Sequence, residues 1–504
     1  MQIEPQASAF AKRYARGEAQ VVWTTLVADL ETPVSAFLKI AGGRPMSILL
    51  ESVEGGAVRG RYSIIALEPD LLWRTVEGRA EINRAPRRNG TFTPCNEPPL
   101  QALGALVAES RIELPDALPP MAAGIFGYLG YDMVRLMEEL PAPNPDPIGI
   151  PDAVLMRPTV VVVFDAVSDM ITVVTPVRPE KGVPAKTALA RASERLSAIV
   201  DALDRPLDHA AANGSSGPLT VLPGSNTTPA EYARMVRAAK EYIAAGDIFQ
   251  VVLAQRFEPP FELPPFALYR ALRRTNPSPY LYFLDLGDFA IAGSSPEILV
   301  KVSGGTVTIR PIAGTRARGA TPHEDKALES ELLADPKERA EHLMLLDLGR
   351  NDVGRVAEIG TVKVTDQFFI ERYSHVMHIV SNVEGKLSAK HDAIDALAAG
   401  FPAGTVSGAP KVRAMEIIDE LEKEKRGLYA GAVGYFSAAG DMDTAIVLRT
   451  ALIKDGTMYV QAGAGIVADS DPKAEQQECV NKAKALFRAA EEARRFASAA
   501  RRGQ

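Results

Sequence analysis

The sequence predicts two acidic helices, each carrying a pair of glutamates that could bind a cation. The first covers residues 335–355 (DPKERAEHLMLLDLGRNDVGR), where Asp335 can cap the helix and Pro336 suits its first turn. Glu338 and Glu341 are three residues apart, so a helix places them on one face. We therefore expect an acidic face near the start of this helix.

The second predicted helix repeats this design over residues 471–486 (DPKAEQQECVNKAKAL), with Glu475 and Glu478. Four carboxylates brought together would repel one another unless a divalent cation lay between them, and oxygen ligands of this kind suit Mg²⁺. The alternative is two solvated faces, because Glu478 and Lys482 have the i,i+4 spacing of an ordinary surface salt bridge. Taken alone, these residues favour the solvated faces.

Length and composition indicate a soluble protein with more than one domain. At 504 residues the chain exceeds the size of a single hydrophobic core, and 46% hydrophobic with 24% charged residues is typical of globular proteins. A net charge of -7 argues against a nucleic-acid partner. Cys95 and Cys479 lack the spacing of a disulfide framework or a zinc site, as in a reducing cytosol. With no predicted signal peptide or membrane span, we expect a cytoplasmic protein without a membrane partner.

Residues 204–228 form the predicted domain boundary. This stretch is rich in Pro, Gly, Ser and Asn and has no hydrophobic periodicity, as expected of a linker. It separates a predicted N-terminal domain, residues 20–203, from a predicted C-terminal domain, residues 229–495.

Short apolar runs separated by turns predict a mixed α+β fold with antiparallel sheet. Gly287-Asp288 and Gly304-Gly305 mark turns between successive strands. Strands are expected at 47–51, 64–66, 160–164, 171–174, 249–255, 281–286, 289–293, 298–302, 306–310, 362–364, 377–383, 432–437, 444–452 and 458–464. Helices are expected at 100–110, 186–203, 229–245, 265–274, 392–399 and 411–421. The glycines of residues 124–131 suit close strand packing better than a phosphate loop, because no lysine follows them.

Six blocks of the C-terminal half occur together and in order. They are PIAGTRARG (311–319), ERAEHLMLLDLGRNDVGR (338–355), SHVMHIVS (374–381), PAGTVSGAPK (402–411), GAVGYF (431–436) and QAGAGIVADSDP (461–472). Through them the chain resembles anthranilate synthase component I, in the family of chorismate-utilising enzymes, over roughly residues 229–490. The resemblance implies two intergrown domains built on antiparallel β-sheets flanked by helices, with a chorismate-binding catalytic domain at 229–495 and a regulatory domain at 20–203.

The same resemblance favours the metal site over solvated faces. It implies that Glu341 and Glu478 bind Mg²⁺ directly and that Glu338 and Glu475 hold its waters. Chorismate is a dianion, and its ring carboxylate would be repelled by these glutamates without a bridging Mg²⁺. The implied catalytic residues are Glu297 as general acid, His378 for progress past the aminated intermediate, Thr405 and Lys482. The implied substrate-binding residues are Gly314, Thr315, Tyr429 and Arg449, together with the main-chain amides of Gly463, Ala464 and Gly465.

Two positions distinguish the chemistries of this family. Relatives that add water carry a lysine base where this chain has Gln250, and an amide cannot deprotonate water. Aminodeoxychorismate synthases carry a lysine nucleophile where this chain has Ala313. Both positions indicate ammonia addition at C2 and loss of pyruvate. An aminodeoxychorismate synthase subunit and a non-catalytic regulatory homologue are the alternatives.

Two further expectations concern regulation and the ammonia source. The LLES sequence at 49–52 resembles the family's tryptophan-binding motif, and NPSPY at 276–280 resembles the second half of that pocket. The expected L-tryptophan-binding residues are Glu51, Ser52, Pro279, Tyr280 and Leu281; alternatively, LLES only ends a core strand and NPSPY is only a turn. Neither cysteine lies in a Gly-x-Cys-x-Gly elbow, so a separate glutamine amidotransferase subunit is expected to supply ammonia.

Overall fold

The longest ladder of the molecule joins β3 (Val58–Val76) to β7 (Ala153–Asp165). In this computed structural model, which describes residues 1–54, 58–207, 224–373 and 376–499, the ladder runs antiparallel from Tyr62 opposite Asp165 to Thr75 opposite Ala153. Both strands consist mainly of buried apolar and β-branched residues, which pack well on a pleated surface. The rest of the sheet extends from this central pair.

Two arms of antiparallel strands lead away from the central pair. From β3 the first arm runs through β2 (Ser47–Glu54), β10 (Tyr280–Asp285), β11 (Ala290–Ser295), β20 (Thr450–Lys454), β21 (Thr457–Ile466), β9 (Gln250–Phe257) and β17 (Gly408–Ala409). From β7 the second arm runs through β6 (Gly124–Leu129), β18 (Ala432–Ser437), β19 (Met442–Ile446), β12 (Ile298–Ser303), β13 (Thr306–Ile309) and β16 (Val376–Lys386). The predicted antiparallel α+β class is confirmed.

Shorter elements complete the sheet. β14 (Ile312–Ala317) and β15 (Lys363–Arg372) both pair with β16, while β8 (Met170–Val177) joins β7 to β1 (Gln20–Val27). β4 (Arg79–Asn83) and β5 (Thr93–Pro94) follow β3. The glycines of β6 serve close strand packing, as predicted: a Cβ on Gly127 would lie 2.0 Å from the carbonyl oxygen of Val154.

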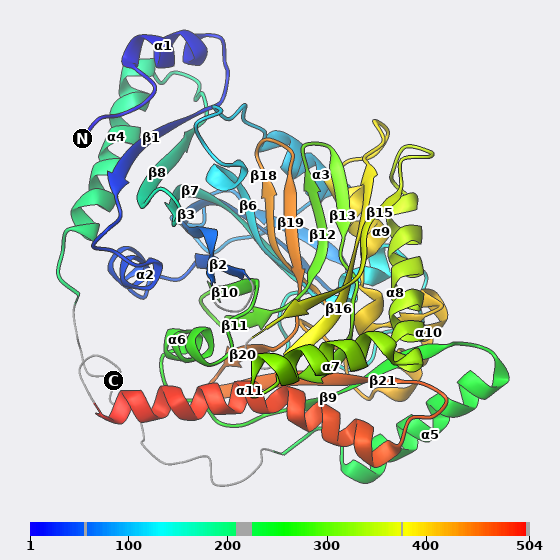
Figure 1. The fold of residues 1–504 in the computed structure, drawn as a ribbon. Coiled ribbons are helices and arrows are strands. Elements are labelled where there is room, and N and C mark those ends of the chain that lie inside the picture. Colours follow the sequence, from blue (N-terminus) through cyan, green and yellow to red (C-terminus); the bar gives the residue numbers. More distant parts are fainter. Residues whose placement is uncertain (55–57, 208–223, 374–375, 500–504) are drawn as a thin grey trace.

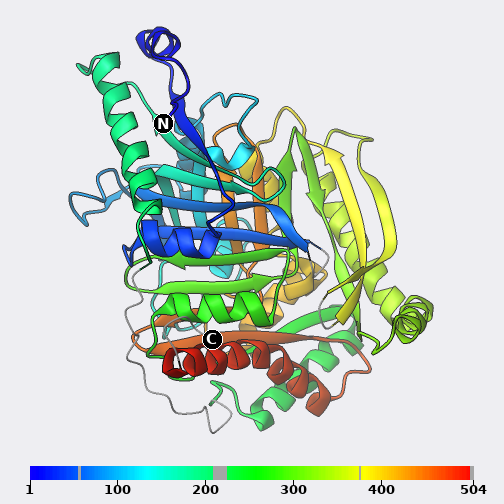
Figure 2. The same ribbon diagram turned by 60° about the vertical axis from the view of Figure 1, so that its left-hand side comes forward.

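Helices cover the outer faces, and one apolar core lies between the arms. That inner core contains Phe126, Tyr282, Ile291 and Val433, contributed by both arms. The first arm packs outward on α2 (Pro33–Ala41), α6 (Pro265–Thr275) and α11 (Pro472–Ala499), and α11 lies along the lower edge of the molecule in Figure 1. α4 (Ala185–Leu203) covers β1 and β8. The second arm packs on α3 (Pro99–Glu109), α8 (Pro336–Gly354) and α9 (Ala393–Gly400), whereas α10 (Lys411–Leu421) packs on β9 and β17 at the end of the first arm. Figure 2 shows β15 and β16 (yellow) at one side of the molecule.

Both halves of the chain contribute to each arm. β2 pairs with β10 and β6 pairs with β18, so strands from before and after residues 204–228 hydrogen-bond directly. Most of the predicted boundary, residues 208–223, lies outside the described residues, and α5 (Pro229–Ala245) follows it behind a capping box of Thr228 and Glu231. The division into two domains stays a prediction.

The strand predicted at 444–452 is wrong as a single element. β19 ends at Ile446 and β20 begins at Thr450, and Arg449 between them has a φ of 47°. A non-glycine residue in this left-handed region requires support from its surroundings, which sequence patterns do not reveal. The sequence analysis also did not predict β1, β14, α1 (Ala7–Ala15), α2 or α7 (Pro322–Ala334). Within the described ranges, no helix combines the length and the apolar character needed to cross a bilayer.

Candidate active site

A cavity of about 780 Å³ collects nearly all of the residues that the sequence analysis singled out as catalytic, substrate-binding or metal-binding. Ala464 does not line the cavity: its side chain packs in the core around α5 and β9, and the binding role expected of its main-chain amide stays a prediction. The predicted residues that line the cavity are Glu297, Gly314, Thr315, Glu338, Glu341, His378, Thr405, Tyr429, Arg449, Gly463, Gly465, Glu475, Glu478 and Lys482. Residues that are up to 185 positions apart in the chain therefore share one space.

Local sequence chemistry orients the two acidic helices as predicted. The Asp335 side chain caps α8 by accepting from the backbone N–H groups of Lys337 and Glu338, at 2.9 and 3.3 Å. Asp471 does the same at the start of α11, accepting from Lys473 and Ala474 at 3.0 and 2.9 Å. Because each pair of glutamates follows its cap directly, both pairs lie at helix starts facing the cavity.

The four carboxylates influence one another electrostatically. Burial raises the pKa of Glu341, a hydrogen bond from Gln250 opposes that shift, and the charges of Glu338 and Glu478 raise the pKa further. Burial likewise raises the pKa of Glu475, and the charge of Glu478 adds to it. Mutual repulsion of this kind is what a divalent cation would relieve.

Three of the four carboxylates have a close partner, and each of the three has a different partner. Glu338 pairs with Arg316 at 2.8 Å, Glu478 with Lys482 at 2.7 Å, and the Gln250 amide nitrogen donates to Glu341 at 3.2 Å. Among the described residues, no three acidic, histidine or cysteine side chains come close enough together to hold a metal ion. The donor set is nonetheless entirely hard oxygen, and its chemistry fits Mg²⁺.

Glu297 is a buried carboxyl group in the short connection between β11 and β12. Its side chain accepts a 3.1 Å hydrogen bond from the Thr405 hydroxyl, in the 3₁₀ turn Gly404–Val406. Burial raises its pKa to about 8, although the Thr405 bond, the Ile312 backbone and the charge of Arg449 all oppose the shift. Glu297 therefore carries a proton at neutral pH, which a general acid requires.

His378, on β16, is neutral. Burial lowers its pKa to about 4. Its Nδ1 lies 2.9 Å from the carbonyl oxygen of Gly314, which can only accept, so Nδ1 carries the proton and Nε2 has the free lone pair. Thr315 lies 3.2 Å from the same nitrogen, and the ring of Tyr373 contacts the imidazole edge at a centroid distance of 5.4 Å.

Arg449 and Lys482 give the cavity positive charge that can attract an anion. The guanidinium of Arg449 has no hydrogen-bond or ion-pair partner in the described part of the chain, and burial lowers its pKa. Lys482 donates to the carbonyl oxygen of Gly463 at 2.9 Å. A Cβ on Gly463 would lie 2.9 Å from the Tyr429 hydroxyl oxygen, so the strand needs glycine there to approach this ring. A desolvated cation without a partner is a ready site for a carboxylate.

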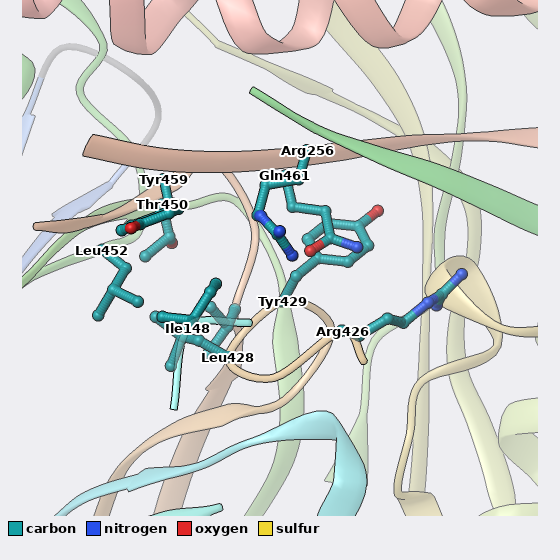
Figure 3. A pocket seen from close by; sticks show the side chains of 10 residues that line it. Ile148, Arg256, Arg426, Leu428, Tyr429, Thr450, Leu452, Tyr459 and Gln461 are labelled. Atoms are coloured by element: carbon teal, nitrogen blue, oxygen red, sulfur yellow. The ribbon is translucent and has the colours of Figure 1, made fainter. Parts of the chain in front are cut away.

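Several lining residues were not predicted, among them Asn276, Pro277, Tyr373 and Gln461. Gln461 and Tyr429 also line an adjoining cavity of about 30 Å³, shown in Figure 3, together with Arg256 and Thr450. Such a volume holds about one water molecule. Asn276 and Pro277 belong to the NPSPY sequence that was expected at the tryptophan site, Gln461 opens the sixth block, and Tyr373 directly precedes the third, so none of them carried a signal for the catalytic cavity itself.

A second cavity, of about 350 Å³, lies beside β2 and contains three of the five residues predicted to bind tryptophan. Glu51, Ser52 and Leu281 line it, and Glu51 lies directly opposite Leu281 in the β2–β10 ladder. Pro279 and Tyr280 do not line it. The Tyr280 hydroxyl donates to Asp443 at 2.9 Å on the other face of the sheet, because neighbouring strand residues point in opposite directions.

The carboxylate of Glu51 is already engaged. Arg273 donates to its two oxygens at 2.6 and 2.8 Å, and the Tyr269 hydroxyl donates at 2.5 Å. Glu51 therefore holds Arg273 and Tyr269 at the cavity wall, and its contact with tryptophan stays a prediction. Pro277 lines both this cavity and the 780 Å³ cavity, so the two share a wall.

Comparisons with known proteins agree with this arrangement. Residues 69–488 match the family model for chorismate binding enzymes. The chain belongs to the chorismate binding enzyme family. It is 58% identical over 498 residues to anthranilate synthase component 1 of Cereibacter sphaeroides, covering 98% of this chain and 99% of that protein. It is 49% identical over 471 residues to the protein of the same name in Pseudomonas aeruginosa, covering 92% and 94% of the two chains.

Two solved structures share the fold. The crystal structure of anthranilate synthase component I from Streptococcus pneumoniae superposes with a TM-score of 0.75 at 39% identity, covering 92% of this chain and 99% of that one. The menaquinone-specific isochorismate synthase of Escherichia coli superposes with a TM-score of 0.69 at 20% identity, covering 96% and 100%. The second likeness shows the fold alone.

Proposed function

We propose that this chain is the synthase component of an anthranilate synthase, which converts chorismate and ammonia to anthranilate, pyruvate and water. The single observation that carries this proposal is the cavity that is lined by a protonated Glu297, by four glutamates and by Arg449, which has no partner among the described residues. The same product is indicated by the names of relatives that match nearly the whole chain.

The chain's own residues can perform the steps that this reaction needs. Glu297 donates its proton to the C4 hydroxyl group, which leaves as water while ammonia bonds to C2. Arg449 and Lys482 hold a substrate carboxylate. Neutral His378, with Nε2 free, can accept a proton when the ring becomes aromatic and pyruvate leaves. Gln250 offers an amide and no base, so it cannot activate water as a lysine could.

A Mg²⁺ ion is part of this proposal. Glu341 and Glu478 would hold it, with Glu338 and Glu475 at its waters, and it would neutralise the repulsion between these carboxylates and the substrate's ring carboxylate. Support comes from the all-oxygen donor set and the like-charge contributions to the pKa values of Glu341 and Glu475.

Feedback inhibition by L-tryptophan is a further part of the proposal. The 350 Å³ cavity beside Ser52 has room for an indole and is separate from the catalytic cavity. Asn276, next to Pro277 in the shared wall, is linked to Arg449 through Ser294. The Asn276 carbonyl oxygen accepts from the Ser294 hydroxyl at 2.5 Å, and the Ser294 N–H donates to the carbonyl oxygen of Arg449 at 3.2 Å. Inhibitor and substrate would weaken each other's binding reciprocally.

Anthranilate fluorescence tests the proposal directly. Purified chain is mixed with chorismate, Mg²⁺ and ammonium at alkaline pH; anthranilate should form, and glutamine should replace ammonium only when a glutamine amidotransferase subunit is added. Chorismate consumption to isochorismate or aminodeoxychorismate would overturn the assignment. Turnover of glutamine by the chain alone would overturn the need for a separate amidotransferase.

A further inference from the structure

The guanidinium of Arg316 lies among three carboxylates, one of which faces the catalytic cavity. Its Nη1 is 2.8 Å from Glu338, its Nη2 is 2.8 Å from Asp335, and its Nε is 3.1 Å from Glu331. Nη1 also donates to the carbonyl oxygen of Thr315 at 3.0 Å. The Arg316 and Glu338 side chains are each only 22% exposed, so their ion pair is partly shielded from water.

The two oxygens of Glu338 have different surroundings. Oε1 is the atom that accepts from Arg316. Oε2 faces Gly314 on the cavity wall, 3.2 Å from where a Cβ on that glycine would lie. No other hydrogen-bond partner of this carboxylate occurs in the described part of the chain. Glu338 thus presents one oxygen to the cavity while the other is held by a monovalent cation.

We propose that Arg316 is an internal counter-cation of Glu338, which a divalent cation in the catalytic cavity displaces when it recruits that carboxylate. The inference rests on the metal site of the proposed function. Exchange is favourable because Arg316 gives up only one of three acidic partners and keeps Asp335 and Glu331. Bringing a dication to Glu338 also replaces a singly charged partner with a doubly charged one.

This arrangement differs from the pairing of the other cavity carboxylates. Lys482 lies four residues after Glu478 on the same helix, so that pair can separate without moving one element past another. Arg316 instead joins β14 to the start of α8. β14 also carries Gly314 and Thr315, which line the substrate cavity. Release of Glu338 would therefore loosen the contact between the carboxylate helix and the strand that forms the substrate wall.

Binding of Mn²⁺ to the full chain without substrate tests this inference, measured by calorimetry and by the loss of the free-ion electron paramagnetic resonance signal. If Arg316 competes with the metal, Arg316→Gln should bind Mn²⁺ about 1.5- to 5-fold more tightly, the range expected for one partly exposed ion pair. Arg318→Gln is the matched control. It makes the same charge change in the same segment, but Arg318 pairs with Asp325, at 2.8 Å, outside the cavity.

An opposite change should have the opposite effect. Glu331 is 62% exposed, and Glu331→Gln removes one competitor for Arg316 without altering the cavity. Arg316 should then hold Glu338 more firmly, and Mn²⁺ binding should weaken. This mild surface substitution also keeps the test intact if Arg316→Gln does not fold, which circular dichroism would show.

A double-mutant cycle isolates the contact. In a Glu338→Gln background, Arg316→Gln should no longer change the Mn²⁺ dissociation constant. Unchanged or weaker Mn²⁺ binding by Arg316→Gln, an equal effect of Arg318→Gln, or a persisting effect without Glu338 would each overturn the inference and leave the metal site standing. If the unaltered chain does not bind Mn²⁺ at millimolar concentration, the proposed metal site fails, and this inference fails with it.

Discussion

Replacing Thr405 with valine tests whether the buried environment of Glu297 sets the pH range of catalysis. The Thr405 hydroxyl donates to Glu297 at 3.1 Å, which stabilises the carboxylate over the acid and lowers the pKa. A hydrogen bond to a charged group contributes about 1.5–3 kcal/mol, and one pKa unit corresponds to about 1.36 kcal/mol. Since 3.1 Å is long for O–H···O, we expect a shift of about one unit.

The sign of the change follows from the protonation that catalysis needs. Glu297 acts as an acid only when protonated, so activity should fall as pH rises through its pKa of about 8. Without the Thr405 bond the carboxyl group keeps its proton to higher pH, and the alkaline limb of the rate profile should move up to about pH 9.

Anthranilate fluorescence across neutral and alkaline pH measures this limb, with free NH₃ held constant by adjusting total ammonium. Thr405→Ser keeps the hydroxyl group and should leave the alkaline limb in place. Glu297→Gln should remove most of the activity, and the remaining activity should show no alkaline limb. The maximal rate of Thr405→Val does not test the reasoning, because Thr405 lines the cavity and its loss can lower the rate at every pH. A limb that stays at the wild-type pH, or moves to lower pH, would refute the reasoning.

Three other substitutions probe separate parts of the molecule. Glu341→Gln should abolish Mg²⁺-dependent turnover while the thermal midpoint stays close to that of the wild type, since a metal carboxylate is not a packing element; full activity would contradict the metal role. Ser52→Phe should fill the 350 Å³ cavity and raise the tryptophan concentration needed for half inhibition, with activity in the absence of tryptophan unchanged; equal sensitivity would show that this cavity is misassigned. Gly465→Ala would place a Cβ 2.5 Å from the amide nitrogen of Gln250 and so displace the Gln250 side chain from Glu341. We expect kcat/KM to fall by about 10- to 100-fold. Unchanged kinetics would mean that Gln250 takes no part in catalysis.

Much of the fold could be predicted from the sequence because it depends on local signals. The helices α4, α5, α6, α8 and α10 begin and end within two residues of their predicted bounds, since their periodicity, proline starts and caps all lie within a few positions. The hairpin β7–β8 was also predicted, because its valine-rich strands are separated by a polar turn, but β7 begins at Ala153 and β8 ends at Val177, well outside the predicted bounds. The pairing order of the strands could not be predicted, because it depends on contacts between residues far apart in the chain.

The acidic helices show the same division. Three-residue spacing behind an Asp-Pro cap determined that Glu338 and Glu341 share a face, and likewise Glu475 and Glu478. Spacing could not distinguish a shared cavity from two solvated faces. Only the packing of α8 and α11 around one cavity placed the four carboxylates within range of one another's charge.

Other features of the site arise only from the tertiary structure. The sequence 444–452 is a plausible strand, but the fold breaks it at Arg449 and places that guanidinium in the cavity with Glu297. Tyr280 was expected beside the inhibitor, but the register of β10 turns it to the opposite face. The amino-acid sequence by itself determined which chemical groups are available and how close neighbours are oriented. Tertiary burial decided their protonation and their partners, because desolvation and charge act through space and not along the chain.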